Sequence, residues 1–322
     1  MRPSTAAARR LIDLYMDTIT SDGTRRAYRR NLNRWVDWCD AQDADPLDAR
    51  KTHVLLWLAE LDRDGYSTAT RAQMLSAASS WYEWLLSEGR ISQNPTKIDR
   101  RKRPKVNKHH SDTIGLSPAQ ARELQQLADD DSTSSSVIVA VLLQCALRIS
   151  ELGNASIEDL TMDRGHQVLR IVGKGNQPEW VTMPPAVMER IRAHLAERDE
   201  APSEQLPALQ PGSHLPRPLV VTPAGRRVTE LYAWRLLRRL GHRSTADLAA
   251  VANRLHPHVG RHTAITTALD AGVPLRDVQD WARHRSPDTT RRYDRSRNNP
   301  DRSPSYRISG LLTPDTDQGE TA

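Results

Sequence analysis

The segment 94–113 constrains the fold most, because its apolar residues show almost no periodicity. A stretch of this kind offers no hydrophobic face, so a single core cannot run through it. A chain of 322 residues also suits about two domains. We therefore predict a helical domain, a linker, a second domain and a polar tail, at 1–94, 95–113, 114–300 and 301–322.

The predicted linker is strongly basic, with six arginines and lysines between Arg100 and Lys108. It is either a solvated charged connector or a strap that lies along a phosphate backbone. The density of basic residues favours the strap, and the net charge of +6 agrees with a polyanionic partner. Only six of the 46 basic residues are lysines, so an isolated lysine is more informative than an arginine.

Apolar residues at helical spacing predict three or four amphipathic helices in the first domain. One of them, 24–42, begins at Thr24 as N-cap and has a stripe of Tyr28, Leu32, Trp35, Val36 and Cys39. Two more are predicted at 52–65 and 67–89. Both end at glycines, which suit the position that follows a helix.

The second domain combines helices with one β-hairpin. Alternating apolar residues around a glycine-rich turn predict the hairpin at 167–184. Helices are predicted at 116–130, where a Ser-Pro pair forms the cap, at 136–150 and at 185–198. The fold class is therefore mainly α with a small β-sheet (α+β).

Arg148 interrupts the apolar stretch LLQCALRISELGNASIEDL (142–160), where an unpaired cation would be unfavourable. Glu151 follows three positions later and would be its neighbour on one helix face. The two residues form either a surface ion pair, worth ~0–1 kcal/mol, or a buried arginine held by glutamate. The second arrangement is the one expected of an anion-binding fork.

Lys174 lies at the predicted hairpin tip, in VGKGN, and is the only lysine after residue 108. Lysine can give up its proton whereas arginine cannot, so this position suits a general acid. A solvated turn lysine is the alternative. The spacing of a phosphate-binding GxxxxGK[ST] loop is absent.

His258 and Arg261 lie three apart at the start of a predicted helix, and His262 follows His258 by four positions. Histidines at this spacing can bind zinc, but there is no HExxH pattern and no acidic residue nearby, so we predict no metal. The free N–H groups of a helix N-terminus favour an anion instead.

Tyr293 lies nine residues after His284, on a short helix that is predicted to begin at Ser286. A phenol has a pKa of ~10, so a nucleophilic tyrosine needs nearby positive charge. The surrounding arginines can supply it. A tyrosine packed under a basic surface is the alternative.

Taken in order, these residues closely resemble the active site of the tyrosine recombinase (phage integrase) family. ALRISELGNASIEDL resembles its first arginine box, and VGKGNQPEWVTMP resembles its lysine hairpin. HPHVGRHTAITTALDAGVPLRDVQDWARH resembles the second box, and SPDTTRRY resembles the nucleophile helix. The helical first domain is similar to the SAM-like core-site-binding domain of the Xer-like, two-domain members.

The resemblance implies a site-specific DNA recombinase that uses no cofactor. Tyr293 would attack a DNA phosphate and form a 3′-phosphotyrosyl link. Arg148 and Arg261 would clamp the phosphate oxygens, where negative charge accumulates in the transition state.

Four more residues complete this implied mechanism. His258 and His284 would add hydrogen bonds, and His258 would also accept the tyrosine proton. Lys174 would protonate the leaving 5′ oxygen. Glu151 would orient Arg148 or His258.

The implied partners are double-stranded DNA target sites and a homotetramer assembled on DNA, alone or with a second recombinase or accessory proteins. The two domains would form a C-shaped clamp, and the apolar segment 308–312 would dock on a neighbouring subunit. We expect DNA contacts from Arg25, Arg26, Arg29, Arg30, Arg71, Arg101, Lys102, Arg103 and Lys105.

Two positions depart from the family pattern. Gly260 replaces a common apolar residue, and Arg283 stands where the family usually has glycine, before His284. We expect Arg283 to disturb the local turn, and the departures favour integration and excision of a mobile element. Xer-type dimer resolution, a type IB topoisomerase and a catalytically silent DNA-binding regulator are the alternatives, and Tyr306 is the alternative nucleophile.

Other features limit the class of protein. No run of ~18 apolar residues and no secretory signal occurs, so we expect a cytoplasmic protein without a membrane partner. Cys39 and Cys145 lie among apolar residues and are predicted to be buried thiols.

Overall fold

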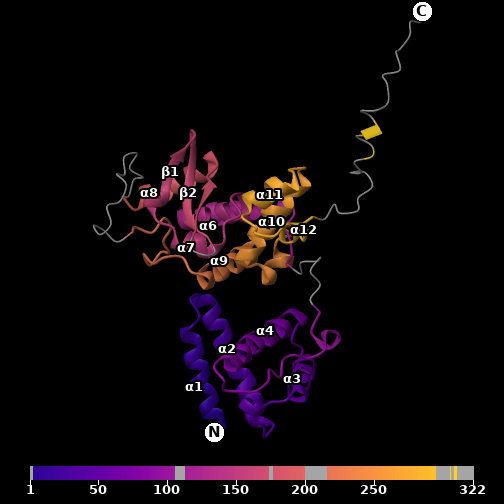
Figure 1. The fold of residues 1–322 in the computed structure, drawn as a ribbon. Coiled ribbons are helices and arrows are strands. Elements are labelled where there is room, and N and C mark those ends of the chain that lie inside the picture. The colour runs from indigo at the N-terminus through magenta and orange to yellow at the C-terminus, as the bar shows by residue number, and fades with distance from the viewer. Residues whose placement is uncertain are drawn as a thin grey trace, which may run out of the picture. The chain divides into compact units, whose positions relative to one another are not determined.

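The computed structural model describes residues 3–105, 113–173, 177–199 and 216–294, together with Ser305, Ile308 and Ser309. The chain divides into two compact units, Met1–Asn107 and Lys108–Ala322. Figure 1 shows a helical N-terminal unit and a C-terminal unit with a small sheet.

The N-terminal unit contains the helices α1 (Pro3–Asp17), α2 (Asp22–Ala41), α3 (Lys51–Arg63) and α4 (Thr68–Ser87), and the short 3-10 helices η1 (Pro46–Asp48) and η2 (Arg100–Lys102). The C-terminal unit contains the helices α5 (Pro118–Asp129), α6 (Thr133–Gln144), α7 (Ile149–Asn154), α8 (Pro185–Glu197), α9 (Glu230–Arg243), α10 (Pro257–Asp270), α11 (Leu275–Trp281) and α12 (Pro287–Arg291). It also contains η3 (Ile157–Asp159), η4 (Ala249–Arg254) and the strands β1 (Leu160–Asp163), β2 (His166–Val172) and β3 (Pro178–Thr182).

The N-terminal unit packs its helices around aromatic side chains. Trp35, Trp57, Trp81 and Tyr82 are buried, and the ring centroids of Trp35 and Trp57 are 4.9 Å apart. Trp35 Nε1 donates a hydrogen bond of 2.8 Å to the Tyr82 hydroxyl, which donates one of 2.7 Å to the Pro46 carbonyl. The core thus buries large rings and still satisfies these polar atoms.

The helices that were predicted for this unit are present, but α2 and α3 begin at other residues than predicted. The stripe of α2 faces the core, and Cys39 is buried as predicted. Thr24 as the N-cap is wrong: Ser21 caps α2, and its hydroxyl accepts from the Thr24 N–H. The start of the helix predicted at 52–65 is also corrected, because α3 begins at Lys51 and Arg50 is its N-cap residue.

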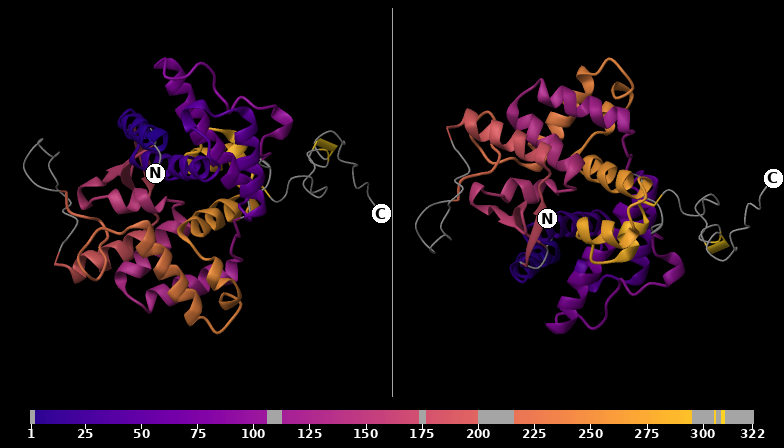
Figure 2. Two further views of the ribbon diagram at one scale, coloured as in Figure 1. Left: turned by 90° about the horizontal axis from the view of Figure 1, so that it is seen from below. Right: turned by 90° about the horizontal axis from the view of Figure 1, so that it is seen from above.

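The C-terminal unit is organised around α6, which is buried along most of its length because it contacts α5, α8 and α10. Figures 1 and 2 show the sheet at one end of this unit and α10, α11 and α12 at the other. The sheet is antiparallel with the order β1-β2-β3. The predicted hairpin is confirmed, with Leu169 paired to Val181 and Ile171 paired to Glu179.

The predicted helix 136–150 is wrong in its second half. The helix α6 ends at Gln144, Ala146 takes a left-handed conformation with φ +47°, and α7 begins only at Ile149. Local apolar spacing favours one continuous helix, but long-range hydrogen bonds to the Ala146 carbonyl from Arg261 and Arg283 hold the break. No helix in the described part of the chain is both long and apolar enough to cross a membrane.

Candidate active site

Arg261 is a buried cation held by the C-termini of two helices. Its side chain lies on α10, and the residue is 1% exposed. Its two Nη atoms donate to the carbonyls of Ala146, just beyond α6, and Ala282, the C-cap of α11. Helix C-termini carry partial negative charge, so they stabilise a guanidinium here. Burial lowers its pKa to about 10, helped by the charges of Arg148 and Arg283, so it stays protonated at neutral pH.

Arg148 and Glu151 are in contact, but in a different arrangement from the predicted one. Arg148 is the N-cap of α7, and its backbone N–H donates to Glu151 Oε2 at 2.8 Å while its Nη1 donates to Oε1. The arginine side chain is 43% exposed, whereas that of Glu151 is 6% exposed. The prediction of a buried arginine is therefore wrong: the carboxylate is buried, and the guanidinium keeps an open face.

His284 follows the end of α11, where the backbone of the preceding residue is left-handed. Arg283 has φ +56°, and its N–H donates to the Asp280 carbonyl while the His284 N–H donates to the Gln279 carbonyl, both at 3.0 Å. This pair of bonds is the Schellman motif. His284 Nδ1 pairs with Thr290 Oγ1 at 2.9 Å, which fixes the ring. The expected disturbance of the turn by Arg283 is thus not found: arginine adopts the glycine-like conformation.

Tyr293 is buried beside these groups. The predicted helix is shorter than expected, because α12 ends at Arg291 and Tyr293 lies in the turn beyond it. Its ring centroid is 5.7 Å from that of His284 and 4.7 Å from that of His262. Burial raises the pKa of the phenol, and the charge of Arg261 opposes this rise. The structure therefore brings Arg148, Arg261, His258, His284 and Tyr293 into one electrostatically coupled cluster.

The protonation states in this cluster follow from burial. Burial lowers the pKa of His284 to about 4, and the charges of Arg261, Arg148 and Arg283 act in the same direction. Burial and the charge of Arg261 also lower the pKa of His258. Both imidazoles are therefore neutral at pH 7. Burial raises the pKa of Tyr293 although Arg261 and Arg148 lower it, so the nucleophile candidate is a neutral phenol.

The presence of glycine at position 260 has a steric explanation. A Cβ atom at this position would lie 2.8 Å from Leu142 Cβ, because α10 and α6 approach closely there. The common apolar residue at this position would collide with α6. Gly260 therefore brings Arg261 within reach of the Ala146 carbonyl.

Two family models cover most of the chain. The model described as "Phage integrase family" matches residues 115–299, and "Phage integrase, N-terminal SAM-like domain" matches residues 11–89. The chain belongs to the phage integrase family. These proteins are tyrosine recombinases, enzymes that cleave and rejoin DNA, and the predicted resemblance of the chain to this family is confirmed.

Individual relatives agree with this assignment. Tyrosine recombinase XerD of Pseudomonas aeruginosa is 27% identical over 88% of this chain and 91% of its own length. Tyrosine recombinase XerC of Corynebacterium efficiens is 28% identical over 85% and 81%. The Tn1549 transposon integrase in complex with a circular intermediate DNA shares the fold, with a TM-score of 0.64, 16% identity and coverage of 89% and 94%.

Lys174 lies outside the described residues of this recombinase. On either side of it, β2 and β3 are placed, and the Gly173 N–H donates to the Gln177 carbonyl at 2.8 Å. The predicted tail segment 308–312 and Tyr306 likewise lie outside the described residues, apart from Ile308 and Ser309.

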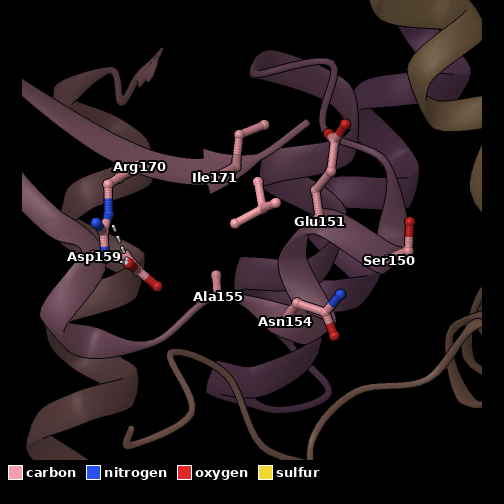
Figure 3. Close-up of a pocket in the computed structure, with 8 residues that line it drawn as sticks. Ser150, Glu151, Asn154, Ala155, Asp159, Arg170 and Ile171 are labelled. Carbon is pink, nitrogen blue, oxygen red and sulfur yellow. Dashed lines mark hydrogen bonds and ion pairs between the residues drawn. The ribbon is translucent and has the colours of Figure 1, made fainter. Parts of the chain in front are cut away.

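A pocket of the recombinase lies between α7 and β2, next to the buried carboxylate. Figure 3 shows Glu151 at one side of it and the ion pair of Arg170 with Asp159 at the other. Ser150 and Asn154 of α7 also line it. The pocket therefore borders Glu151 on the side of α7 and β2.

The basic residues that were predicted to contact DNA differ in their surroundings. Three bind acidic side chains of their own unit: Arg25 pairs with Asp22, Arg29 with Asp13, and Arg71 with Asp62. The others are exposed, on α2 or around η2: Arg26, Arg30, Arg101, Lys102, Arg103 and Lys105. The exposed set is therefore the better candidate for phosphate contacts.

Two residues that contact members of the cluster were missed as candidates. His262 packs against its ring, and Arg283 binds Glu151. His262 carried the signal of its i, i+4 spacing from His258, but Arg283 was noted only as a departure. Within the described residues, no group of three or more His, Cys, Asp and Glu side chains lies close enough together to hold a metal ion.

Proposed function

We propose that this recombinase cleaves DNA through Tyr293, with Arg148 and Arg261 as the phosphate clamp. The observation that carries the proposal is the burial of Tyr293 against His284, within the field of Arg261. Arg261 uses two donors on backbone carbonyls, so three of its five N–H groups remain for an anion. Together with the open face of Arg148, they form a preorganised site for the charge of the transition state.

Proton transfer follows from the neutral imidazoles. The Tyr293 oxygen bonds to phosphorus while its proton passes to His258, which is neutral because its pKa is lowered. The bond from phosphorus to the 5′ oxygen breaks, and Lys174 protonates that oxygen. His284, whose Nδ1 is occupied by Thr290, offers Nε2 to a non-bridging oxygen. The product is a 3′-phosphotyrosyl link, which a second 5′ hydroxyl can reverse.

The substrate is double-stranded DNA, bound by both units. The DNA-bound transposon integrase, which shares the fold, supports this, as does the exposed basic set on α2 and around η2. Exchange between two duplexes needs four active sites, so we propose a homotetramer on DNA, acting in the cytoplasm. The two-domain form suits mobile-element integration as well as resolution of chromosome or plasmid dimers, and the departures at Gly260 and Arg283 favour the former.

Covalent capture tests the proposal. The wild-type protein is incubated with a pool of random-sequence duplexes that carry a nick, which traps the cleaved strand. Complexes that survive denaturation are recovered, and their DNA is sequenced. We expect one preferred site, and strand exchange between two labelled duplexes that carry it.

Two variants and one substrate serve as controls. Tyr293→Phe should form no adduct, whereas Tyr306→Phe should form as much as the wild type. An adduct in Tyr293→Phe would refute the assignment of the nucleophile. Relaxation of supercoiled DNA that lacks the site, without strand exchange, would instead indicate a topoisomerase.

A further inference from the structure

Arg283 occupies a position that favours glycine, yet its side chain is built into the structure. Its backbone is left-handed, with φ +56°, at the residue after the C-cap of α11. Glycine adopts this conformation without strain, and a Cβ atom makes it unfavourable. The side chain is only 6% exposed. A strained backbone and a buried guanidinium at one residue indicate that the side chain has a role.

Arg283 contacts two groups that also bind Arg148 and Arg261, the arginines of the proposed phosphate clamp. Its Nη2 donates to Glu151 Oε2 at 2.9 Å and to the Ala146 carbonyl at 3.3 Å. Glu151 also binds Arg148, and the Ala146 carbonyl also binds Arg261. Its Nη1 donates to the Trp281 carbonyl at 3.0 Å, which fixes the guanidinium in this orientation.

Charge balance shows what Arg283 adds. Without it, the single negative charge of Glu151 would cancel the single positive charge of Arg148. With it, the Glu151 carboxylate binds a second guanidinium as well, so it neutralises less of the charge of Arg148, which stays available for an anion. Burial acts to raise the pKa of Glu151, but the charge of Arg283, and then the bonds from Arg148, outweigh it and lower the pKa. Glu151 is therefore ionised, and its orientation depends on both arginines.

Arg283 also reaches the hairpin. Its Nε lies 3.5 Å from Glu179 Oε2, on β3. The Glu179 carboxylate is packed against Gly173, at the end of β2, where an added Cβ would lie 2.6 Å from Glu179 Cδ. Arg283 thereby connects α11, α7 and the base of the hairpin.

We propose that Arg283 is a positioning residue for DNA cleavage, which holds Glu151 so that the Arg148 guanidinium is oriented and remains positively charged toward the phosphate. This inference rests on the proposed function. Arg283 itself touches no DNA in this account. Its loss therefore slows the cleavage step and leaves DNA affinity unchanged.

The test uses Arg283→Gly, which relieves the backbone, and Arg283→Lys, which keeps the charge. The probe is the nicked duplex that the wild-type protein selects. Single-turnover adduct formation measures the cleavage rate, and duplex binding is measured separately. We expect Arg283→Gly to lose roughly tenfold or more in rate, less than the ~10²–10³-fold that follows loss of a donor to the reacting group. The dissociation constant should stay within about threefold, and Arg283→Lys should recover part of the rate.

Two further measurements separate positioning from folding. The melting temperature of Arg283→Gly gives the folded fraction, by which the adduct rate is corrected, and the pKa of His284, measured by NMR, should rise because a nearby cation has been removed. Arg239→Gln is the matched control: it also removes an arginine from an ion pair, that with Asp131, which contacts no residue of the cluster. It should leave the cleavage rate unchanged.

The outcomes are distinct. An adduct that forms at the wild-type rate in Arg283→Gly would overturn this inference alone. So would a rate that falls only in proportion to the folded fraction. No adduct with the wild-type protein would overturn the proposed function and this inference with it.

Discussion

The core of the N-terminal unit and the cluster around Tyr293 bury very different side chains. In the N-terminal core, large tryptophan and tyrosine rings are buried, and the buried polar residues among those described are neutral: Thr5, Asn31, Asn94 and Thr96. Around Tyr293, the buried side chains include a glutamate, a histidine and an arginine. The burial of large apolar rings stabilises the first region. The second region buries charged groups, and the burial of a charge is unfavourable unless that charge has partners.

The backbone shows the same contrast. In the described part of the N-terminal unit, the non-glycine residue with positive φ is Asp43, which lies in an exposed turn and belongs to a type that tolerates this conformation. In the cluster, Ala146 and Arg283 have positive φ, and both are buried at the ends of helices. Strain of this kind persists only where surrounding contacts impose it, and it is typical of functional sites.

The largest effect is expected from Arg261→Ala compared with Arg148→Ala. Both should reduce adduct formation by more than ~10²-fold, because each removes donors to the phosphate. Their effects on stability should differ. Loss of Arg261 removes the donor of the Ala282 carbonyl, leaves the Ala146 carbonyl with Arg283 alone, and should destabilise the C-terminal unit by about 2–5 kcal/mol. Loss of the half-exposed Arg148 should cost about 1 kcal/mol. Hydrogen exchange of α10 measures the difference, and equal destabilisation would contradict the contrast between them.

Trp35→Ala tests the other region. Removal of this buried ring should destabilise the N-terminal unit by about 3–5 kcal/mol. Because the two units have separate cores, the pKa of His284 should not change. Hydrogen exchange of α2 and NMR titration of His284 check the two statements. A shift of the histidine pKa would show that the regions are not independent.

His284→Gln probes the buried imidazole through pH. The pKa of His284 is about 4 in the folded protein and ~6.5 in an unfolded chain. Between these values the unfolded chain binds the proton more readily. Its stabilising contribution is therefore complete above pH ~6.5 and is lost as the pH falls toward 4, by about 3 kcal/mol at most. Gln cannot titrate, so the variant should lose less stability than the wild type between pH 7 and 4.5. Identical losses in urea denaturation would count against a neutral, buried His284.

Gly260→Ala tests the close approach of α6 and α10. The new methyl group overlaps Leu142 and should destabilise the C-terminal unit by about 1–3 kcal/mol. In a Leu142→Ala background, the same change should be better tolerated. Urea denaturation of the wild type, the two single variants and the double variant gives the four free energies of unfolding that a double-mutant cycle needs. Additive effects would rule out contact between these two positions as the reason for the glycine.

These comparisons also show what the sequence could predict. Apolar residues at helical spacing predicted α2 and α4, a Ser-Pro cap predicted the start of α5, and alternation predicted the hairpin, because these signals are local. Ser21 and Thr24 both suit an N-cap, so sequence alone could not choose between them. The end of α6 at Gln144 depends on distant donors to the Ala146 carbonyl. The spacing of apolar residues near Gln144 cannot indicate these long-range hydrogen bonds.

The sequence indicated the members of the candidate site but not their arrangement. Motif order grouped Arg148, Arg261, His284 and Tyr293, and in the structure the charges of the two arginines act on His284 and Tyr293. Sequence could not show that Glu151 rather than Arg148 is the buried member of the pair. It also could not show that Arg283 keeps the turn and binds that carboxylate, since this depends on residues far apart in the chain.

Protein chemistry on the trapped complex tests the central claim most directly. The adduct between the wild-type protein and its selected duplex is digested with a protease and a nuclease, and the peptide that carries the nucleotide is identified by mass spectrometry. We predict a nucleotide linked through its 3′ phosphate to Tyr293. A nucleotide on any other residue, or one linked through a 5′ phosphate, would contradict the account.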